Sequence, residues 1–176
     1  LIAQIDQLLA GQQVRADLPP LACLEQIRQC LAQIHQLQAM LFERIGKLDS
    51  GSDTLTNLLN RRFLPTVLRR EIELSNSNNN GFAVLLIDLD HFKQINDNHG
   101  HEAGDRALQQ VASTLSQYTR GSDYLFRYGG EEFVAVVVGV NLVQSCAIAE
   151  NLRNLIANQP LQLANGTTLQ MTASIG

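Results

Sequence analysis

The sequence has 176 residues, of which 45% are hydrophobic, and carries a formal net charge of −4. This length and apolar content suffice for one substantial hydrophobic core and a smaller appendage. The acidic balance argues against nucleic acid as a partner, because proteins that bind polyanions normally present a basic face. We therefore expect small molecules or proteins as partners.

Targeting and redox signals point to the cytoplasm. The three cysteines are an odd number without a CxxC pair, which is typical of a reducing compartment. No apolar run reaches about 18 residues and no basic segment opens the sequence, so neither a membrane span nor a signal peptide is indicated. We expect a cytoplasmic protein without membrane contact. Because the sequence does not begin with Met, we also expect it to be part of a longer protein.

The first 48 residues predict two helices. Residues 1–10 have helical apolar spacing, and the linker at 12–20 ends in two prolines that cannot continue a helix. A second helix is predicted over 21–48, with one polar interruption, Gln38, in a stripe of apolar residues three and four apart: Leu24, Ile27, Leu31, Ile34, Leu41, Ile45 and Leu48. The stripe fits a coiled-coil seam and equally a helix packed in an antiparallel bundle with the first one.

Residues 49–52 (DSGS) break the helical pattern, which predicts a helical signalling and dimerisation segment over 1–52 and a second domain over 53–176. Helices and strands alternate in the second domain, so we expect an α/β (α+β) fold with helices on a mixed sheet. Helices are predicted at 57–74, capped by Asp53 or Thr54, and at 91–96, 103–118 and 142–158. Strands are predicted at 82–87, 124–128, 133–138 and 169–175, the first of them central and covered on both faces, with a polar loop at 75–81.

The predicted hairpin at residues 127–133 (RYGGEEF) has an unusual turn. Glu131 and Glu132 follow Gly129 and Gly130 and lead directly into an apolar strand. Adjacent like charges beside a buried strand cost energy unless a cation or ligand compensates them. Because glycine also lets a large ligand lie against the backbone, the turn predicts a site for a metal and a flat or phosphorylated ligand.

Further acids end the predicted central strand. Asp88 and Asp90 occupy the end at which open α/β sheets bind ligands. Together with the two glutamates they offer oxygen ligands that suit Mg²⁺. Taken alone, Asp88 fits equally well as an N-cap before His91. Phe92 and Lys93 exclude an EF-hand loop, and no cysteine or helical histidine pair supports a zinc site.

Polar residues crowd between positions 93 and 105. Asn96 and Asp105 are suited to read the hydrogen-bonding edge of guanine, because Asp accepts from N–H groups. Each residue alone fits a turn or a helix cap, and His101 fits an ordinary local histidine. Residues 120–123 (RGSD) are either a polar loop or a clamp for phosphate or guanine.

Four ordered stretches resemble the GGDEF-domain diguanylate cyclases. These are residues 53–62 (DTLTNLLNRR), 88–97 (DLDHFKQIND), 100–105 (GHEAGD) and 127–133, the last being a signature with Glu at its third position. The resemblance covers residues 53–176 and implies a nucleotide-cyclase or palm-like GGDEF fold preceded by an α-helical segment. The helical region before residue 53, together with residues 61–65 (RRFLP), is also similar to globin-coupled, haem-based oxygen-sensing members, which implies haem only in an upstream domain outside this sequence.

The resemblance implies an enzyme that joins two GTP into cyclic di-GMP with release of two pyrophosphates, in a homodimer whose facing domains each hold one GTP. It implies Mg²⁺, or Mn²⁺, held by Asp88, the backbone carbonyl of Leu89, Glu131 and Glu132, with the two glutamates as the catalytic pair. The implied substrate-binding residues are Lys93, Asn96, His101, Asp105, Gly129 and Gly130. Arg120 and Asp123 match the family's RxxD site, which implies inhibition by bound cyclic di-GMP.

The sequence departs from the family pattern in two places. Asn151 stands where the family often has the partner arginine of the RxxD site, with Arg153 close by. The family also has a further helix and strand after the segment that ends here at Gly176, so we expect a C-terminally truncated fragment with weak or no activity. A non-catalytic module that binds GTP or cyclic di-GMP, and a purely structural dimerisation fragment, are the alternatives. The intact acids favour the enzyme.

Overall fold

The computed structural model describes residues 25–34, 36–37, 40, 51–78, 81–163 and 166–176. The chain divides into two compact units, Leu1–Gln38 and Ala39–Gly176. Residues 25–34 and 36–37 are helical, as predicted for the second helix, whereas the helix predicted at 1–10 lies outside the described residues. The predicted boundary at residue 52 stays a prediction. Within the described ranges, no helix has the length and apolar character needed to cross a membrane.

Three residues of the predicted apolar stripe can be assessed in the first unit. Ile27, Leu31 and Ile34 are 55%, 41% and 45% exposed. The other stripe positions lie outside the described residues. Both the coiled coil and the intramolecular bundle therefore stay predictions.

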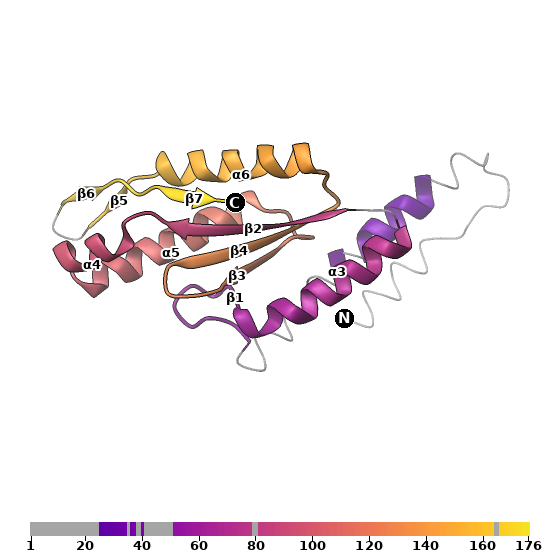
Figure 1. The fold of residues 1–176 in the computed structure, drawn as a ribbon, viewed down its shortest axis with the longest axis horizontal. Coiled ribbons are helices and arrows are strands. Elements are labelled where there is room, and N and C mark those ends of the chain that lie inside the picture. Colours follow the sequence, from indigo (N-terminus) through magenta and orange to yellow (C-terminus); the bar gives the residue numbers. More distant parts are fainter. Residues whose placement is uncertain (1–24, 35, 38–39, 41–50, 79–80, 164–165) are drawn as a thin grey trace. The chain divides into compact units, whose positions relative to one another are not determined.

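The second unit contains a five-stranded mixed sheet with the strand order β1-β3-β4-β2-β7 (Figure 1). β1 is parallel to β3, and the other neighbours are antiparallel. In sheet order the strands are Leu59–Asn60, Tyr124–Arg127, Glu132–Val138, Phe82–Leu89 and Ala173–Ile175. β5 (Leu161–Gln162) and β6 (Thr168–Leu169) form a separate two-stranded sheet.

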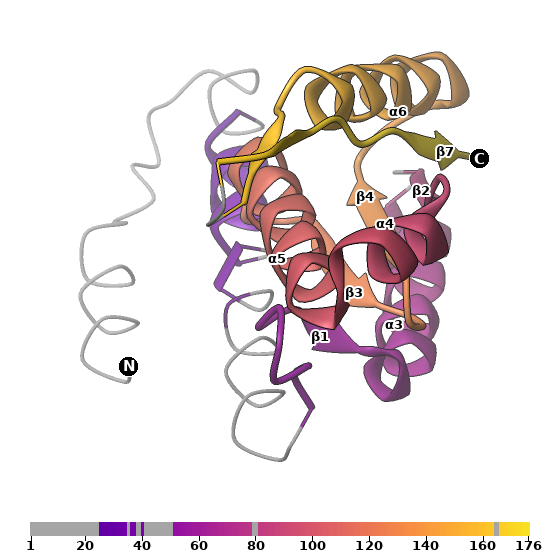
Figure 2. The ribbon, with the colours of Figure 1, turned by 90° about the vertical axis from the view of Figure 1, so that its left-hand side faces the viewer.

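Helices cover both faces of the sheet (Figures 1 and 2). One face packs against α4 (Phe92–His99), α5 (His101–Tyr118) and α6 (Leu142–Ala157), while α3 (Leu64–Asn78) lies on the other. Two hydrophobic clusters result, a larger one beneath α5 and α6 and a smaller one beneath α3. This mixed sheet with flanking helices confirms the predicted α/β (α+β) class.

The strand that is covered on both faces is β4, not β2 as predicted. Phe133 and Ala135 of β4 join the larger cluster, while Val134 and Val136 join the smaller one. In β2, Leu85, Ile87 and Leu89 face the larger cluster, but Val84 and Leu86 on the other face are 44% and 46% exposed. The prediction that the strand with this apolar run is covered on both faces was therefore wrong for β2.

The helix predicted at 57–74 starts later than expected. Leu59 and Asn60 form β1 beside β3, and the 3-10 turn η1 (Arg61–Phe63) follows before α3 begins at Leu64. Asn60 caps η1 by accepting a hydrogen bond from the amide of Arg62. Asp53 accepts from Thr56 and so caps a turn instead of a helix. Burial of Leu59 in the sheet outweighs the helical spacing of this segment.

Most other elements agree with the predictions within a few residues. α3 extends to Asn78, into the predicted polar loop, and α4 continues to His99. α5, α6 and both hairpin strands lie close to their predicted ranges. The strand predicted at 169–175 is in fact two short strands, β6 and β7, which belong to different sheets.

A buried polar cluster fixes α3 on the sheet. The Tyr124 hydroxyl of β3 donates to Glu71 Oε1 at 3.2 Å, and Arg70 donates to the same hydroxyl and carboxylate. Burial raises the pKa of Tyr124 to about 12. The phenol therefore stays a hydrogen-bond donor at neutral pH, which keeps the buried carboxylate of Glu71 paired.

Candidate functional site

The hairpin between β3 and β4 closes tightly at the two glycines. The amides of Tyr128 and Gly129 both donate to the carbonyl of Glu132, at 2.8 and 3.2 Å. A Cβ atom at position 129 would lie only 2.3 Å from Oε2 of Glu132. A side chain at position 129 would therefore displace the carboxylate of Glu132, which lies against the turn. At Gly130, by contrast, a Cβ atom would meet no other atom of the described residues within 4 Å, so this position is open to a ligand.

Two of the expected metal ligands lie side by side on neighbouring strands. Asp88 of β2 pairs directly with Glu132 of β4. The Leu89 amide donates to the Glu131 carbonyl at 3.3 Å, which makes the next pair, Asp88 and Glu132, a non-hydrogen-bonded pair with closely spaced side chains. Like charges opposite each other destabilise an antiparallel pair. The fold tolerates an unfavourable charge pair at this point.

The donor set fits a hard divalent cation. Asp88 and Glu132 offer carboxylate oxygens beside the backbone of Leu89, and Mg²⁺ is commonly held by one or two carboxylates together with substrate phosphates. In the described residues, no three His, Cys, Asp or Glu side chains converge into a metal-binding group. Glu131 therefore does not join the other two acids in a closed cluster, and its role as a ligand stays a prediction.

Asp90, unlike Asp88, is held by hydrogen bonds to a neighbouring segment of the fold. The hydroxyls of Thr172 and Ser174 both donate to its carboxylate at 2.7 Å, and these hydrogen bonds hold the pKa of Asp90 below its usual value. Asp90 thereby ties the end of β2 to β7. His91, in the left-handed region with φ 59°, is the N-cap of α4, so the alternative of an N-cap at Asp88 was wrong.

The expected guanine-reading residues lie where α4 meets α5. A Cβ atom at Gly104 would lie 2.1 Å from Oδ1 of Asn96, so the Asn96 side chain packs directly over this glycine. Asp105 follows Gly104 on α5 and is exposed, as are Lys93 and His101. The structure therefore places Asn96 against the glycine that precedes Asp105, while nucleotide binding by Asn96, Asp105, Lys93 and His101 stays a prediction.

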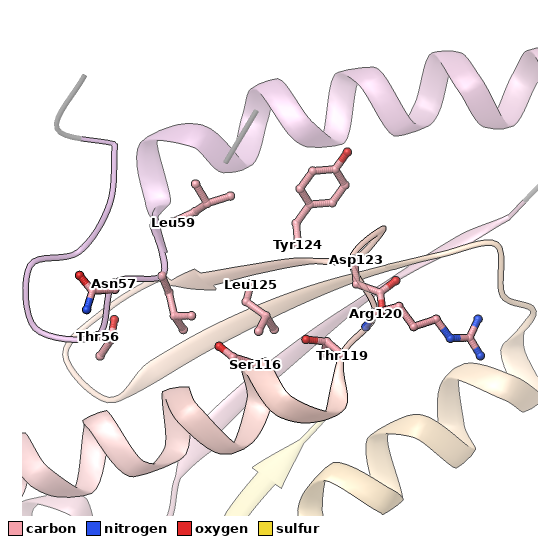
Figure 3. Close-up of a pocket in the computed structure, with 11 residues that line it drawn as sticks. Thr56, Asn57, Leu59, Ser116, Thr119, Arg120, Asp123, Tyr124 and Leu125 are labelled. Atoms are coloured by element: carbon pink, nitrogen blue, oxygen red, sulfur yellow. The ribbon is translucent and has the colours of Figure 1, made fainter. Parts of the chain in front are cut away.

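The RxxD residues border a cavity of about 390 Å³ between the 56–59 segment, β3 and the end of α5 (Figure 3). Arg120 and Thr56 lie at opposite ends of it. The Asp123 carboxylate accepts from the amides of Arg120, at 2.9 Å, and Val138, at 3.1 Å, so it also holds the loop in shape. Arg153 is engaged by Glu150 at 2.7 and 2.8 Å. Asn151 is exposed.

One ion pair near the turn was missed by the sequence reasoning. Arg127, immediately before the signature glycines, binds Asp53 at 3.1 Å and the carbonyl of Gly130 at 2.9 Å. The sequence pattern indicates Asp53 as a helix cap and as the start of the 53–62 stretch, but not as a partner of Arg127. The available signal was an arginine on a short strand that leads into the glycine turn, but its partner lies 74 residues away in sequence.

Acid should weaken this pair. Burial alone would raise the pKa of Asp53, but hydrogen bonds from Thr56 and Arg127 outweigh it and hold the pKa below its ordinary value of 3.8. A carboxyl with a depressed folded-state pKa stabilises the fold above its unfolded pKa and loses this contribution as pH falls through the folded pKa. We expect Asp53→Asn to flatten the loss of stability below about pH 4. Urea midpoints of the wild-type protein and of Asp53→Asn at pH 7, 5, 4 and 3 measure this difference. The same fall in midpoint between pH 5 and pH 3 in both proteins would contradict the expectation.

The chain is similar to a known family and to individual known proteins. The profile of the family described as "Diguanylate cyclase, GGDEF domain" matches residues 50–176. Diguanylate cyclase DosC of Escherichia coli K12 is 42% identical over 153 residues, which cover 87% of this chain and 33% of that protein. The chain therefore spans about a third of that relative's length.

Two solved structures agree with this match. A sensory box/GGDEF family protein of Caulobacter crescentus CB15 has a TM-score of 0.68 and 35% identity, covering 72% of this chain and 81% of the other. The coiled coil and GGDEF domain of DgcB from Caulobacter crescentus, in complex with c-di-GMP, has a TM-score of 0.67 and 26% identity, covering 88% and 76%. With the GGEEF hairpin and its paired acids, these findings show that the chain belongs to the GGDEF-domain diguanylate cyclase family.

Proposed function

We propose that the protein is a diguanylate cyclase that condenses two GTP into cyclic di-GMP and two pyrophosphates. The observation that carries the proposal is the pairing of Asp88 with Glu132 beside the Gly129-Gly130 turn. An uncompensated acid pair on neighbouring strands, next to a turn open to a large ligand, suits a cation and the phosphates of a nucleotide. The family match and the cyclic di-GMP bound by the DgcB relative support the same chemistry.

The residues take separate roles in this proposal. Asn96 and Asp105, at the junction of α4 and α5, bind the guanine edge. Lys93, at the start of α4, and His101, at the start of α5, approach the rest of the nucleotide. Gly129 and Gly130 keep the turn free of side chains so that the nucleotide lies against its backbone. These contacts orient the ribose 3′-hydroxyl of one GTP toward the α-phosphorus of the other.

Glu131 and Glu132, with Asp88 and the carbonyl of Leu89, hold Mg²⁺ or Mn²⁺ in this scheme. When bound, the cation polarises the phosphate and neutralises charge on the leaving pyrophosphate. The new bond joins the 3′-oxygen to the α-phosphorus, the bond to pyrophosphate breaks, and the hydroxyl proton passes to a nearby base. Repeating the step on the second GTP closes the ring.

Dimerisation would control turnover, because one domain holds only half of the reactants. The three- and four-residue spacing of Ile27, Leu31 and Ile34 supports an intermolecular helical seam, since an apolar stripe along a helix is stabilised when a second copy covers it. We expect the specific activity of the full-length protein to fall on dilution through the dimer dissociation range, and Ile34→Asp to shift that range upward. Sedimentation at matched concentrations provides the comparison. Activity independent of concentration in a strictly monomeric sample would contradict this role.

Product inhibition is proposed to act through Arg120. Its side chain is exposed beside the cavity, whereas removal of Asp123 would also free two backbone amides. We expect Arg120→Ala to raise the inhibition constant of cyclic di-GMP at least about tenfold, because a charge-assisted hydrogen bond contributes about 1.5–3 kcal/mol. Arg69→Ala on α3 is the matched control. Unchanged inhibition in the Arg120 variant would remove this site from the proposal.

The proposal is tested by incubating the full-length protein with GTP and Mg²⁺ and identifying the nucleotide product by mass. Cyclic di-GMP supports it. Binding of GTP without any product would favour the alternative of a non-catalytic receptor. An upstream haem-based oxygen sensor stays a prediction for the whole protein, and an absorption spectrum of that protein tests it.

A further inference from the structure

The guanidinium of Arg127 connects two segments that are far apart in sequence. Nη1 donates to both carboxylate oxygens of Asp53, at 3.1 and 3.2 Å, and Nη2 donates to the carbonyl of Gly130 at 2.9 Å. The side chains of Arg127 and Asp53 are only 16% and 22% exposed. Because both side chains are largely buried, this contact is screened less by solvent than a surface ion pair.

The partner segment is a closed turn at the entrance of the second domain. We call residues 51–60 the entrance turn. Its backbone bonds run from Asp53 to Leu58, from Asn57 to Asp53 and from Asn60 to Gly51, each at 2.8 Å. Asn60 is also the strand partner of Arg127. These bonds close the entrance turn on itself, and Arg127 contacts it both as the strand partner of Asn60 and through its side chain.

The other contact of Arg127 acts directly on the catalytic hairpin. The Gly130 carbonyl belongs to the peptide plane that contains the nitrogen of Glu131, and this plane is rigid. Holding that oxygen therefore orients the chain as it enters Glu131 and Glu132. Backbone hydrogen bonds to the carbonyls of Glu131 and Glu132 hold the strand side of the turn, and the contact from Arg127 holds its glycine side.

We propose that Arg127 is a positioning residue that couples the entrance turn to the orientation of the GGEEF acids, so that displacement of the entrance turn alters turnover. The inference rests on the proposed diguanylate cyclase function. Arg127 touches none of the residues assigned to guanine. Its loss should therefore reduce kcat and leave GTP affinity nearly unchanged, whereas a merely structural ion pair would change stability alone.

Two conservative variants of the full-length protein separate these cases. Arg127→Lys keeps the charge but cannot contact both partners. Asp53→Asn keeps the Oδ1 acceptor that caps Thr56, but it removes the charge and replaces the Oδ2 acceptor of Arg127 with an amide NH2 group, which cannot accept. We expect each to lower kcat about 10- to 100-fold, since a misplacement of about 1 Å can cost that much, with KM and the affinity for a non-hydrolysable GTP analogue within about threefold. The double variant should be no slower than Arg127→Lys alone, because both changes weaken the same contact.

Thr56→Val is the matched control. It removes a hydrogen bond to the same carboxylate and leaves the guanidinium in place, so we expect kcat within about twofold of wild type. A wild-type kcat in both test variants, additive losses in the double variant, or an equal loss in Thr56→Val would overturn the proposal. If Arg127→Lys fails to fold, the kcat of Asp53→Asn alone decides between the proposal and a merely structural ion pair.

Hydrogen exchange separates failure of this inference from failure of the proposed function. If the wild-type protein makes no cyclic di-GMP, the proposed function fails, while the coupling remains measurable at the amides of residues 128–132. We expect faster exchange there in Asp53→Asn than in Thr56→Val, because the link between the entrance turn and the hairpin is lost. Equal exchange in the two variants would overturn the coupling.

Discussion

The full-length Glu132→Gln variant is expected to lose at least about 100-fold of its kcat, because a metal ligand supplies several kcal/mol of transition-state stabilisation. Its stability should not fall. Glu132 lies directly opposite Asp88, and removing one of two facing like charges stabilises a strand pair by about 0.2–1 kcal/mol. Glutamine keeps the shape of the side chain against Gly129. We therefore expect a folded, inactive and slightly more stable protein.

Steady-state rates of cyclic di-GMP formation and urea midpoints without Mg²⁺ measure the two effects. Glu73→Gln, at an exposed position of α3, is the matched control and should change neither. An active Glu132→Gln variant would remove this residue from the chemistry. A strongly destabilised one would show that the carboxylate is a structural partner instead of a site ligand.

Gly104→Ala is expected to weaken GTP binding about tenfold or more, since displacing one hydrogen-bonding side chain costs about 1.5 kcal/mol. The new methyl group would lie 2.1 Å from Oδ1 of Asn96 and 3.2 Å from the Phe92 ring. The amide of Asn96 is the end of a flexible side chain and will rotate away. Alanine also favours a helix interior by about 0.5–1 kcal/mol over glycine, which offsets the crowding. Stability should therefore change little while affinity is lost.

Titration with a non-hydrolysable GTP analogue tests this expectation, and Asn96→Ala serves as the reference. Because both changes remove the same contact, the double variant should bind no more weakly than Asn96→Ala alone. Gln117→Ala, near the end of the same helix, should leave affinity unchanged. Wild-type affinity in Gly104→Ala would show that Asn96 does not read the base from its observed position.

The sequence was most informative where local pattern and burial agree. Apolar residues of α5 and α6, and aromatic and β-branched residues of the two hairpin strands, are buried as their spacing predicts. It was misleading where tertiary pairing decides. Leu59 has helical spacing but is buried as part of a short parallel strand beside β3. The apolar run of β2 predicted coverage of both faces, yet Val84 and Leu86 are exposed.

For the site, spacing predicted which residues carry chemistry but not how they meet. The pairing of Asp88 with Glu132 depends on strand register, which no local motif specifies. Asn96 and Gly104 meet because two helices join at Gly100, with φ 82°. The contact from Arg127 to Asp53 joins residues on different elements and could be found only from the fold.

The most direct test of the proposed function is the ratio of products formed by the full-length protein from GTP with Mg²⁺. Quantifying pyrophosphate and cyclic di-GMP in the same reaction should give two pyrophosphates per cyclic di-GMP, and Glu132→Gln should form both products at least about 100-fold more slowly. Release of inorganic phosphate instead of pyrophosphate, or tight GTP binding with no product, would contradict diguanylate cyclase activity.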